Sequence, residues 1–304
     1  MKRLACLSAI ALTCLSPATP AFADYFAGVQ NIVVTSEERE APLDVIVWYP
    51  ALPGGEAVSL GGNVFFEGTE AMRHAPIAPG AFPLILLSHG AGLAGRAEAM
   101  SWIATQLAEN GFIVAAPTHP GNTGADRSAA QTMQLWLRPS DLSATLDTLE
   151  DGTSFRPHIN FDEIGVLGLS MGGNTALSMA GARLDADLFA RYCDSDDLNA
   201  SLCEWVRSSG VDLRAMDRSL VERDNRDSRV HVAMAIDPAL ADTFETDAFD
   251  RISIPVTLVN LGLATDIPVT VQAAGIAASI PGAGYQVIEN AEHASMFAEC
   301  KPGA

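Results

Sequence analysis

Positive charge is scarce in this chain of 304 residues. There are 18 Lys and Arg residues against 37 Asp and Glu residues, and the formal net charge is −19. A surface with this excess of acid repels the phosphate backbone of nucleic acids and the headgroups of anionic lipids. We therefore expect neither nucleic acid nor a membrane as a stable partner, and we expect a small molecule as the substrate.

Long apolar runs are also rare. One run, Leu4–Leu15, follows a positively charged start and is too short to cross a bilayer. Ala21-Phe22-Ala23 then fits the A-x-A cleavage site of a signal peptide. A lipid anchor on Cys14 is the weaker alternative. The sequence thus predicts a signal peptide over residues 1–23, a mature domain over residues 24–304, and export to a periplasm or beyond.

Cysteine is scarce as well, which limits the possible metal sites and disulfides. Of five cysteines, Cys6 and Cys14 lie in the predicted signal peptide. The other three, Cys193, Cys203 and Cys300, allow three single disulfide pairings, and their spacing does not choose among them. The chain contains no C-x-x-C and no H-E-x-x-H motif, so we predict no metal site.

The middle of the chain alternates strand-like and helix-like segments. Apolar runs at 84–87, 112–116 and 164–167 predict buried strands, and helices are predicted at about 96–109 and 140–149. Such alternation is typical of an α/β domain with a mostly parallel sheet and helices on both faces. We predict about eight strands, with the functional site at their carboxyl ends.

Two long stretches interrupt this alternation. Residues 50–83 are rich in Gly and Pro, which predicts a long loop. Residues 185–229 are polar and helical in character and contain no clear strand. We interpret 185–229 as an insertion that forms a lid over the strand ends, with a surface excursion of no functional role as the alternative.

The motif Gly168-Leu169-Ser170-Met171-Gly172-Gly173 has the pattern G-x-S-x-G-G. It follows a predicted strand and precedes a predicted helix, which is the context of a nucleophile elbow. Such a turn exposes the serine hydroxyl, and glycines two residues before and after it avoid steric clashes. We therefore predict that Ser170 is a nucleophile.

A nucleophilic serine needs a general base and an acid that orients it. His293 follows the last predicted strand and is the expected base. Asp266 and Asp237 each follow one of the two preceding predicted strands. Both aspartates lie between Ser170 and His293 in the chain. We favour Asp266 as the acid and keep Asp237 as the alternative.

The loop after the strand at 84–87 contains several further candidates. The backbone N–H groups of Ala91 and Met171 are expected to form an oxyanion hole. His89 and His119 follow strands and are expected to line the pocket. The pattern G-x-G-x-x-G at 90–95 suggests a dinucleotide site, but the next strand lacks the acid that would bind ribose. We predict no cofactor.

Several stretches together resemble the α/β-hydrolase superfamily. More narrowly, the chain resembles exported serine-type proteins grouped as predicted dienelactone hydrolases, and it is similar to platelet-activating-factor acetylhydrolases. The matching stretches cover most of residues 43–300 and include VIVWYP, LILLSHGAG, NGFIVAAPTHPGN, RPSDLSATLDTL, GVLGLSMGGNTAL, IDPA and IPGAGYQVIENAEHASMFAEC.

The resemblance implies an esterase in which Ser170 and His293 act as nucleophile and base. The acid maps to Asp237 by analogy with the acetylhydrolases and to Asp266 by analogy with most other members. Dienelactone hydrolases carry a cysteine nucleophile, so dienelactone is not implied as the substrate. The sequence therefore predicts a serine carboxylic-ester hydrolase. The alternatives are a lactonase, a thioesterase, a phospholipid acetylhydrolase-like enzyme, or a secreted binding protein without catalytic activity.

Overall fold

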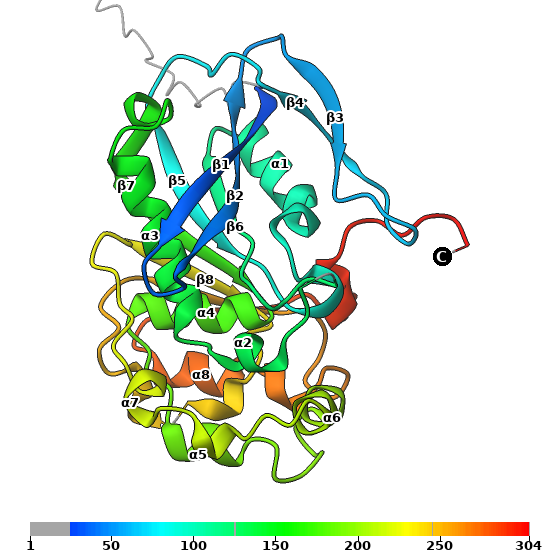
Figure 1. Cartoon of the computed structure of the whole chain (residues 1–304), viewed down its shortest axis with the longest axis vertical. Coiled ribbons are helices and arrows are strands. Elements are labelled where there is room, and N and C mark those ends of the chain that lie inside the picture. Colours follow the sequence, from blue (N-terminus) through cyan, green and yellow to red (C-terminus); the bar gives the residue numbers. More distant parts are fainter. Residues whose placement is uncertain (1–24, 125, 245, 304) are drawn as a thin grey trace, which may run out of the picture.

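The computed structural model describes residues 25–124, 126–244 and 246–303 (Figure 1). The predicted signal peptide over 1–23, with Cys6 and Cys14, lies outside the described residues. Within the described part of the chain, no helix combines the length and the apolar character that a membrane span requires.

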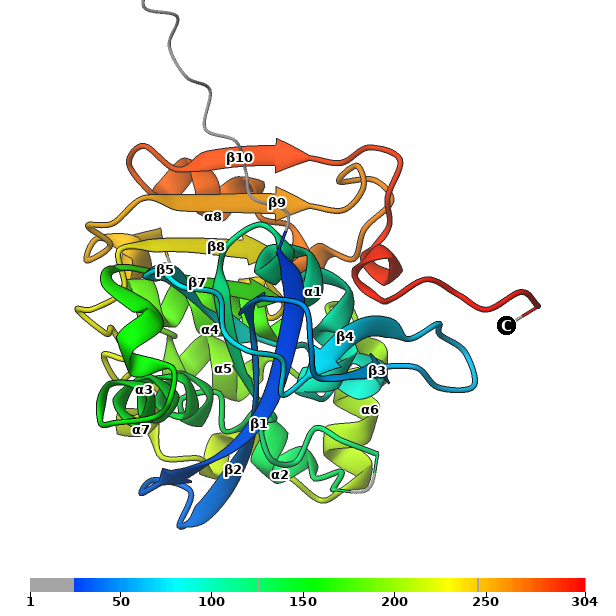
Figure 2. The same cartoon turned by 90° about the horizontal axis from the view of Figure 1, so that it is seen from above.

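A single sheet of ten strands forms the centre of the molecule, in the order β10-β9-β8-β7-β5-β6-β2-β1-β4-β3. Figure 2 shows β10, β9 and β8 side by side at one edge. Six strands, β5 to β10, run parallel to one another. The strand β2 pairs antiparallel with β6. In chain order the strands are β1 (Phe26–Ser36), β2 (Ala41–Ala51), β3 (Glu56–Leu60), β4 (Thr69–Arg73), β5 (Phe82–Ser88), β6 (Ile113–Pro117), β7 (Ile159–Leu169), β8 (Val232–Ile236), β9 (Val256–Asn260) and β10 (Gly284–Val287).

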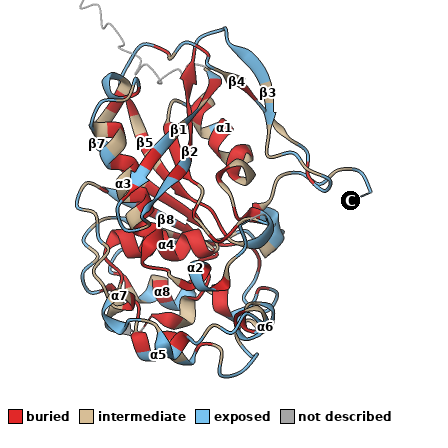
Figure 3. Ribbon diagram, viewed as in Figure 1, coloured by how far each residue is buried: buried red, intermediate tan, exposed pale blue. Residues whose placement is uncertain are grey.

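Helices cover the sheet on both faces. The core on one face contains side chains of α1, and the core on the other contains side chains of α3, α4 and α8. The central strands are buried between these layers, whereas β3 is largely exposed (Figure 3). The α-helices are α1 (Ser101–Glu109), α2 (Ala129–Met133), α3 (Leu137–Glu150), α4 (Met171–Ala180), α5 (Ala186–Arg191), α6 (Ala200–Ser208), α7 (Arg218–Val221) and α8 (Ala274–Ser279).

The continuous apolar runs of the sequence correspond to the central strands, as predicted. All five residues of β6 are buried, because helices cover both of its faces. The parallel arrangement brings the carboxyl ends of β5, β7, β8 and β9 to one edge of the sheet. The segments that follow these strands are therefore positioned to build one site.

The predicted loop over 50–83 is wrong in part, because it contains β3 and β4. These two strands pair antiparallel, and β4 joins the sheet in parallel with β1 through Gly28 and Met72. They raise the number of strands from the predicted eight to ten. Both strands are short, and only one of their residues, Ala71, is buried. The hydrophobic pattern was consequently too weak to reveal them.

The segment 185–229 contains three α-helices, α5, α6 and α7, and no strand. A disulfide between Cys193 and Cys203 ties the segment before α6 to α6 itself. Phe189 and Val206 join the core on the side of α3 and α4, so the segment is packed onto the domain. Of the three possible cysteine pairings the structure contains this one, and Cys300 is exposed and free.

Candidate active site

Ser170 occupies a sharp turn between β7 and α4. Its backbone has φ of 55° and ψ of −121°, a conformation that costs a non-glycine residue about 1–3 kcal/mol. The neighbouring glycines are required sterically. A Cβ atom on Gly168 would lie 1.8 Å from the carbonyl oxygen of Gly172, and one on Gly172 would lie 1.9 Å from that of Ser88. The geometry of this turn is that of a nucleophile elbow.

Hydrogen bonds from the next strand hold the turn in place. The N–H of Ser170 donates to the carbonyl of Ile236 at 3.0 Å, and the N–H of Ala239 donates to the carbonyl of Ser170 at 2.9 Å. The end of β8 therefore supports the strained backbone of the elbow. The same strand end also carries the acid described next.

His293 and Asp237 form a hydrogen-bonded pair. The Nδ1 atom of His293 lies 2.9 Å from Oδ2 of Asp237. The Asp237 side chain is fully buried, and its other oxygen accepts hydrogen bonds from Nδ2 of Asn260 at 2.8 Å and from the N–H of Leu261 at 2.9 Å. Because an oxygen of the Asp237 carboxyl group accepts from Nδ1–H, the lone pair of the imidazole lies on Nε2 of His293.

This contact differs from the preference for Asp266 that the sequence suggested. Asp266 lies in an exposed turn, where its carboxylate accepts a hydrogen bond from the hydroxyl of Thr265 at 3.0 Å. Asp237 sits directly at the end of β8, where its N–H donates to the carbonyl of Val259 at 2.8 Å. The strand pairing thus directs Asp237, the alternative acid, toward His293.

Ser170 and His293 line one cavity of about 660 Å³, a volume typical of ligand pockets. Ala91 and Met171 line it too, and in the described part of the chain neither of their N–H groups has a hydrogen-bond acceptor. Both N–H groups are thus available to an oxyanion. The remaining wall mixes polar and apolar residues, and its large apolar side chains are Leu198, Leu202, Trp205, Leu240, Val271 and Phe297.

The segment 185–229 forms part of this wall. Residues 198–202 and Trp205 face the cavity from the start of α6. Arg127 also lines the cavity, and its guanidinium carbon lies 4.4 Å from the centre of the Trp205 ring, a cation–π contact. Among the described residues, no group of three His, Cys, Asp or Glu side chains is arranged to hold a metal ion.

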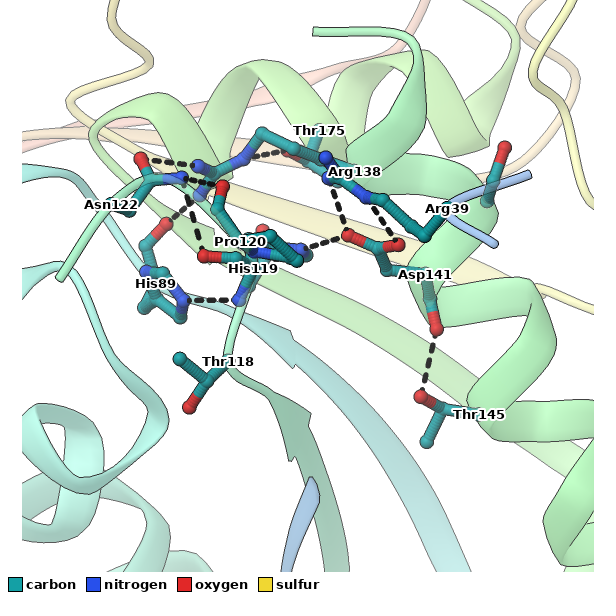
Figure 4. A network of polar contacts seen from close by, with 12 residues as sticks. Arg39, His89, Thr118, His119, Pro120, Asn122, Arg138, Asp141, Thr145 and Thr175 are labelled. Carbon is teal, nitrogen blue, oxygen red and sulfur yellow. Dashed lines mark hydrogen bonds and ion pairs between the residues drawn. The ribbon is translucent and has the colours of Figure 1, made fainter. Parts of the chain in front are cut away.

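His89 and His119 do not line the cavity, so this prediction was wrong. Both are fully buried and belong to a network of polar contacts (Figure 4). Burial holds the pKa of each histidine well below its usual range, so both imidazoles are neutral. The sequence placed both residues at strand ends, but it did not show that their side chains turn inward.

Three polar residues that support the site were not predicted from the sequence. Arg138 and Asp141 lie on α3 and are buried, and Asn260 at the end of β9 binds the carboxylate of Asp237. A signal for the first two does exist in the sequence. They stand three residues apart and share the buried face of α3 with Leu142, a spacing that brings side chains together on a helix.

Comparisons with known proteins agree with this architecture. A ferulic acid esterase from Streptomyces cinnamoneus superposes with a TM-score of 0.52 at 21% sequence identity, covering 90% of this chain and 74% of that chain. The chain has the α/β-hydrolase fold. Residues 67–145 of the chain match the family described as platelet-activating factor acetylhydrolase, isoform II. That segment contains the loop with Ala91 and most of the buried network. No curated protein matches the sequence significantly.

Proposed function

We propose that this α/β-hydrolase is a serine carboxylic-ester hydrolase that forms an acyl-enzyme on Ser170. The observation that carries the proposal is the hydrogen bond between His293 and the buried Asp237, in a cavity that Ser170 also lines. A nucleophile on a strained elbow and an oriented imidazole are the parts that acyl transfer requires.

The reaction follows from these positions. Nε2 of His293 takes the proton of the Ser170 hydroxyl as the oxygen attacks the ester carbonyl carbon. The N–H groups of Ala91 and Met171 stabilise the negative oxygen of the tetrahedral intermediate. Asp237 stabilises the imidazolium of His293, which then protonates the departing alcohol. A water molecule activated by His293 releases the acid and restores Ser170.

The cavity wall supports a substrate with an apolar part. The match to an acetylhydrolase family and the likeness to a ferulic acid esterase both support ester cleavage. Lactones, thioesters and acetylated phospholipids react through the same groups and are the alternatives. Membership of the dienelactone hydrolase group is part of the proposal, with Ser170 in place of a cysteine. A binding protein without activity is the less favoured alternative.

The proposal includes export and a single catalytic domain over residues 24–304. The disulfide between Cys193 and Cys203 supports an oxidising compartment, where such bonds persist. The start of α6 supports the interpretation of 185–229 as a lid, because it contributes side chains to the cavity wall.

A panel of p-nitrophenyl esters of increasing acyl length tests the proposal. The wild type is expected to hydrolyse at least the short esters. Ser170→Ala is expected to lose on the order of 10⁶-fold in kcat, as other serine hydrolases do without their nucleophile. Circular dichroism must show that the variant is folded. Equal activity of the two proteins, or none in the wild type, would refute the proposal.

A further inference from the structure

The proposed mechanism leaves one large feature without a role. A largely buried polar network (Figure 4) binds the carbonyl groups of His89 and Gly90 in residues 89–92, here called the oxyanion loop. Its members are His89, His119, Arg138 and Asp141, together with Arg39 and Ser88. Burying several ionisable side chains is costly unless they are fully paired. The network therefore calls for an explanation.

The geometry of one peptide group links the network to the oxyanion hole. The carbonyl of Gly90 and the N–H of Ala91 belong to the same planar, trans peptide unit, so they point in opposite directions. Any group that holds the oxygen of Gly90 therefore fixes the direction of the Ala91 N–H. This N–H is the oxyanion donor in the proposed mechanism.

His89 holds the oxygen of Gly90. Its Nδ1 atom lies 2.7 Å from that oxygen, and its Nε2 atom lies 3.0 Å from the backbone N of His119. The N–H of His119 is a donor, so Nε2 must accept and the imidazole proton must sit on Nδ1. Burial keeps the pKa of His89 low and the ring neutral. His89 is thereby locked as a donor to Gly90.

Arg138, which lies on α3, also binds the oxyanion loop. Its Nη2 donates to the carbonyl of His89 and lies 3.5 Å from that of Gly90. The rest of the guanidinium is fixed by side-chain oxygens, with Nε 3.2 Å from Thr175 and Nη1 3.2 Å from Asn122. A planar group held at several atoms leaves the two carbonyls little freedom to move.

Further hydrogen bonds hold His119, whose backbone N–H fixes the tautomer of His89. Nδ1 of His119 donates to Oδ2 of Asp141 at 2.8 Å, and its Nε2 accepts from the hydroxyl of Ser88 at 2.9 Å. Asp141 in turn receives two hydrogen bonds from Arg39, at 3.0 and 2.7 Å. The network thus anchors the oxyanion loop to α3 and to the turn between β1 and β2.

We propose that His89 and Arg138 are positioning residues that aim the N–H of Ala91 at the developing oxyanion. This inference rests on the proposed function. Neither side chain reaches the cavity, so neither touches the substrate. Both act through the peptide between Gly90 and Ala91. Because this peptide is held in place beforehand, it need not reorient when the oxyanion forms.

Substitutions of His89 test the proposal. His89→Leu removes the donor to Gly90, whereas Asn at this position can present an amide N–H near the place of Nδ1. We expect kcat of His89→Leu to fall about 10- to 100-fold, somewhat less than the loss of an oxyanion donor. KM should stay within about twofold, because the ground state does not use the oxyanion hole. His89→Asn should recover most of kcat.

A transition-state analogue separates positioning from general damage. A trifluoromethyl ketone forms a tetrahedral adduct whose oxygen occupies the oxyanion hole. Its inhibition constant should rise in His89→Leu by the same factor as kcat/KM falls, while binding of the carboxylic acid product stays unchanged. Equal losses for the ketone and the acid product would overturn the proposal.

Two further variants keep the test decisive. Thr145→Val removes a hydrogen bond within α3 to the backbone carbonyl of Asp141 at 2.8 Å, which involves no atom of the oxyanion loop, and is expected to keep the wild-type kcat. Arg138→Lys retains the charge but not the planar group, and about a tenfold loss in kcat is expected. If His89→Leu does not fold, Arg138→Lys decides, and a wild-type kcat for it overturns the proposal.

The proposed function fails in a different way. If Ser170→Ala hydrolyses esters as fast as the wild type does, Ser170 is not the nucleophile and both proposals fall. If activity depends on Ser170 but a folded His89→Leu behaves like the wild type, only the positioning role is refuted.

Discussion

Among the described residues, two sets of serine, histidine and aspartate are alike in residue types and in the contact between histidine and aspartate. One lines the cavity and consists of Ser170, His293 and Asp237. The other belongs to the polar network that binds the oxyanion loop and consists of Ser88, His119 and Asp141. The distance from the histidine Nδ1 to the carboxylate is 2.9 Å in the first and 2.8 Å in the second. Residue types and spacing alone therefore do not identify the reactive set.

Access and charge distinguish the two sets. The His293 side chain is 32% exposed, whereas the side chains of His119 and Asp141 are completely buried. The donors to Oδ1 of Asp237 are neutral groups, the side-chain amide of Asn260 and the N–H of Leu261. Arg39 forms an ion pair with Asp141. Burial, together with the positive charges of Arg138 and Arg39, lowers the pKa of His119. The buried set thus holds a neutral imidazole in place, whereas the imidazole of the cavity set is accessible from the cavity.

The largest difference expected between the two sets is in nucleophilic reactivity. A fluorophosphonate probe should label the wild type and Ser88→Ala but not Ser170→Ala, because only Ser170 is reachable and activated. Mass spectrometry of the labelled peptides locates the adduct. Label on Ser88 would show that the buried set is reactive and would contradict the difference in access between the two sets.

The next largest effect concerns the acid. Asp237→Asn should lower kcat by about 10³- to 10⁴-fold, because an asparagine amide favours the wrong tautomer of the histidine. Asp266→Asn is the matched control and should keep kcat within about twofold, since Asp266 lies in an exposed turn. Ester hydrolysis under saturating substrate measures both. A large loss in Asp266→Asn alone would reverse the assignment.

A smaller effect, on stability, is expected from opening the disulfide in the segment 185–229, which forms part of the cavity wall. Cys203→Ser opens the disulfide to Cys193, which spans a sequence separation of 10 residues. The loss of this cross-link should lower the free energy of unfolding by about 2–3 kcal/mol. Cys300→Ser removes the exposed free thiol and should leave stability unchanged. Urea unfolding of the oxidised proteins checks this, and equal midpoints would contradict it.

The buried histidines should make the protein sensitive to acid. The pKa values of His89 and His119 are depressed in the folded state, so below about pH 6.5 the unfolded chain binds protons that the folded chain does not. The free energy of unfolding should therefore fall as the pH drops below this value. Each histidine contributes up to about 1.4 kcal/mol per pH unit.

Variants separate this contribution from that of other groups. His119→Asn should reduce the dependence of unfolding on pH between pH 6.5 and 5. His74→Asn is the matched control for replacing a histidine by asparagine, because His74 is exposed and its φ of 55° suits asparagine. Urea unfolding at several pH values gives the slopes. The same slope in His119→Asn as in the wild type would show that His119 is not a buried neutral group.

Features coded by neighbouring residues were predictable from the sequence. The elbow at Ser170 is one, because its glycines and flanking elements are contiguous. The alternation of strands and helices is another, because each buried strand is a short apolar run. His293 was found by chain order, and it does line the cavity with Ser170.

Features that depend on pairing between distant segments were not predictable. Asp237 and Asp266 both follow strands, and only the register of β8 beside β7 and β9 shows which one reaches His293. The direction in which His89 and His119 point depends on Arg138 and Asp141, which come from a helix later in the chain. Similarly, β3 is a strand because β4 pairs with it, not because its own sequence is apolar.

Trapping the acyl-enzyme is the most direct test of the central claim. The wild type is mixed with p-nitrophenyl acetate, quenched in acid within milliseconds, digested and analysed by mass spectrometry. The account predicts an acetyl group on the peptide that contains Ser170, present during turnover and absent in Ser170→Ala. Hydrolysis with the acetyl group on another residue, or turnover that proceeds at the same rate in Ser170→Ala, would contradict it.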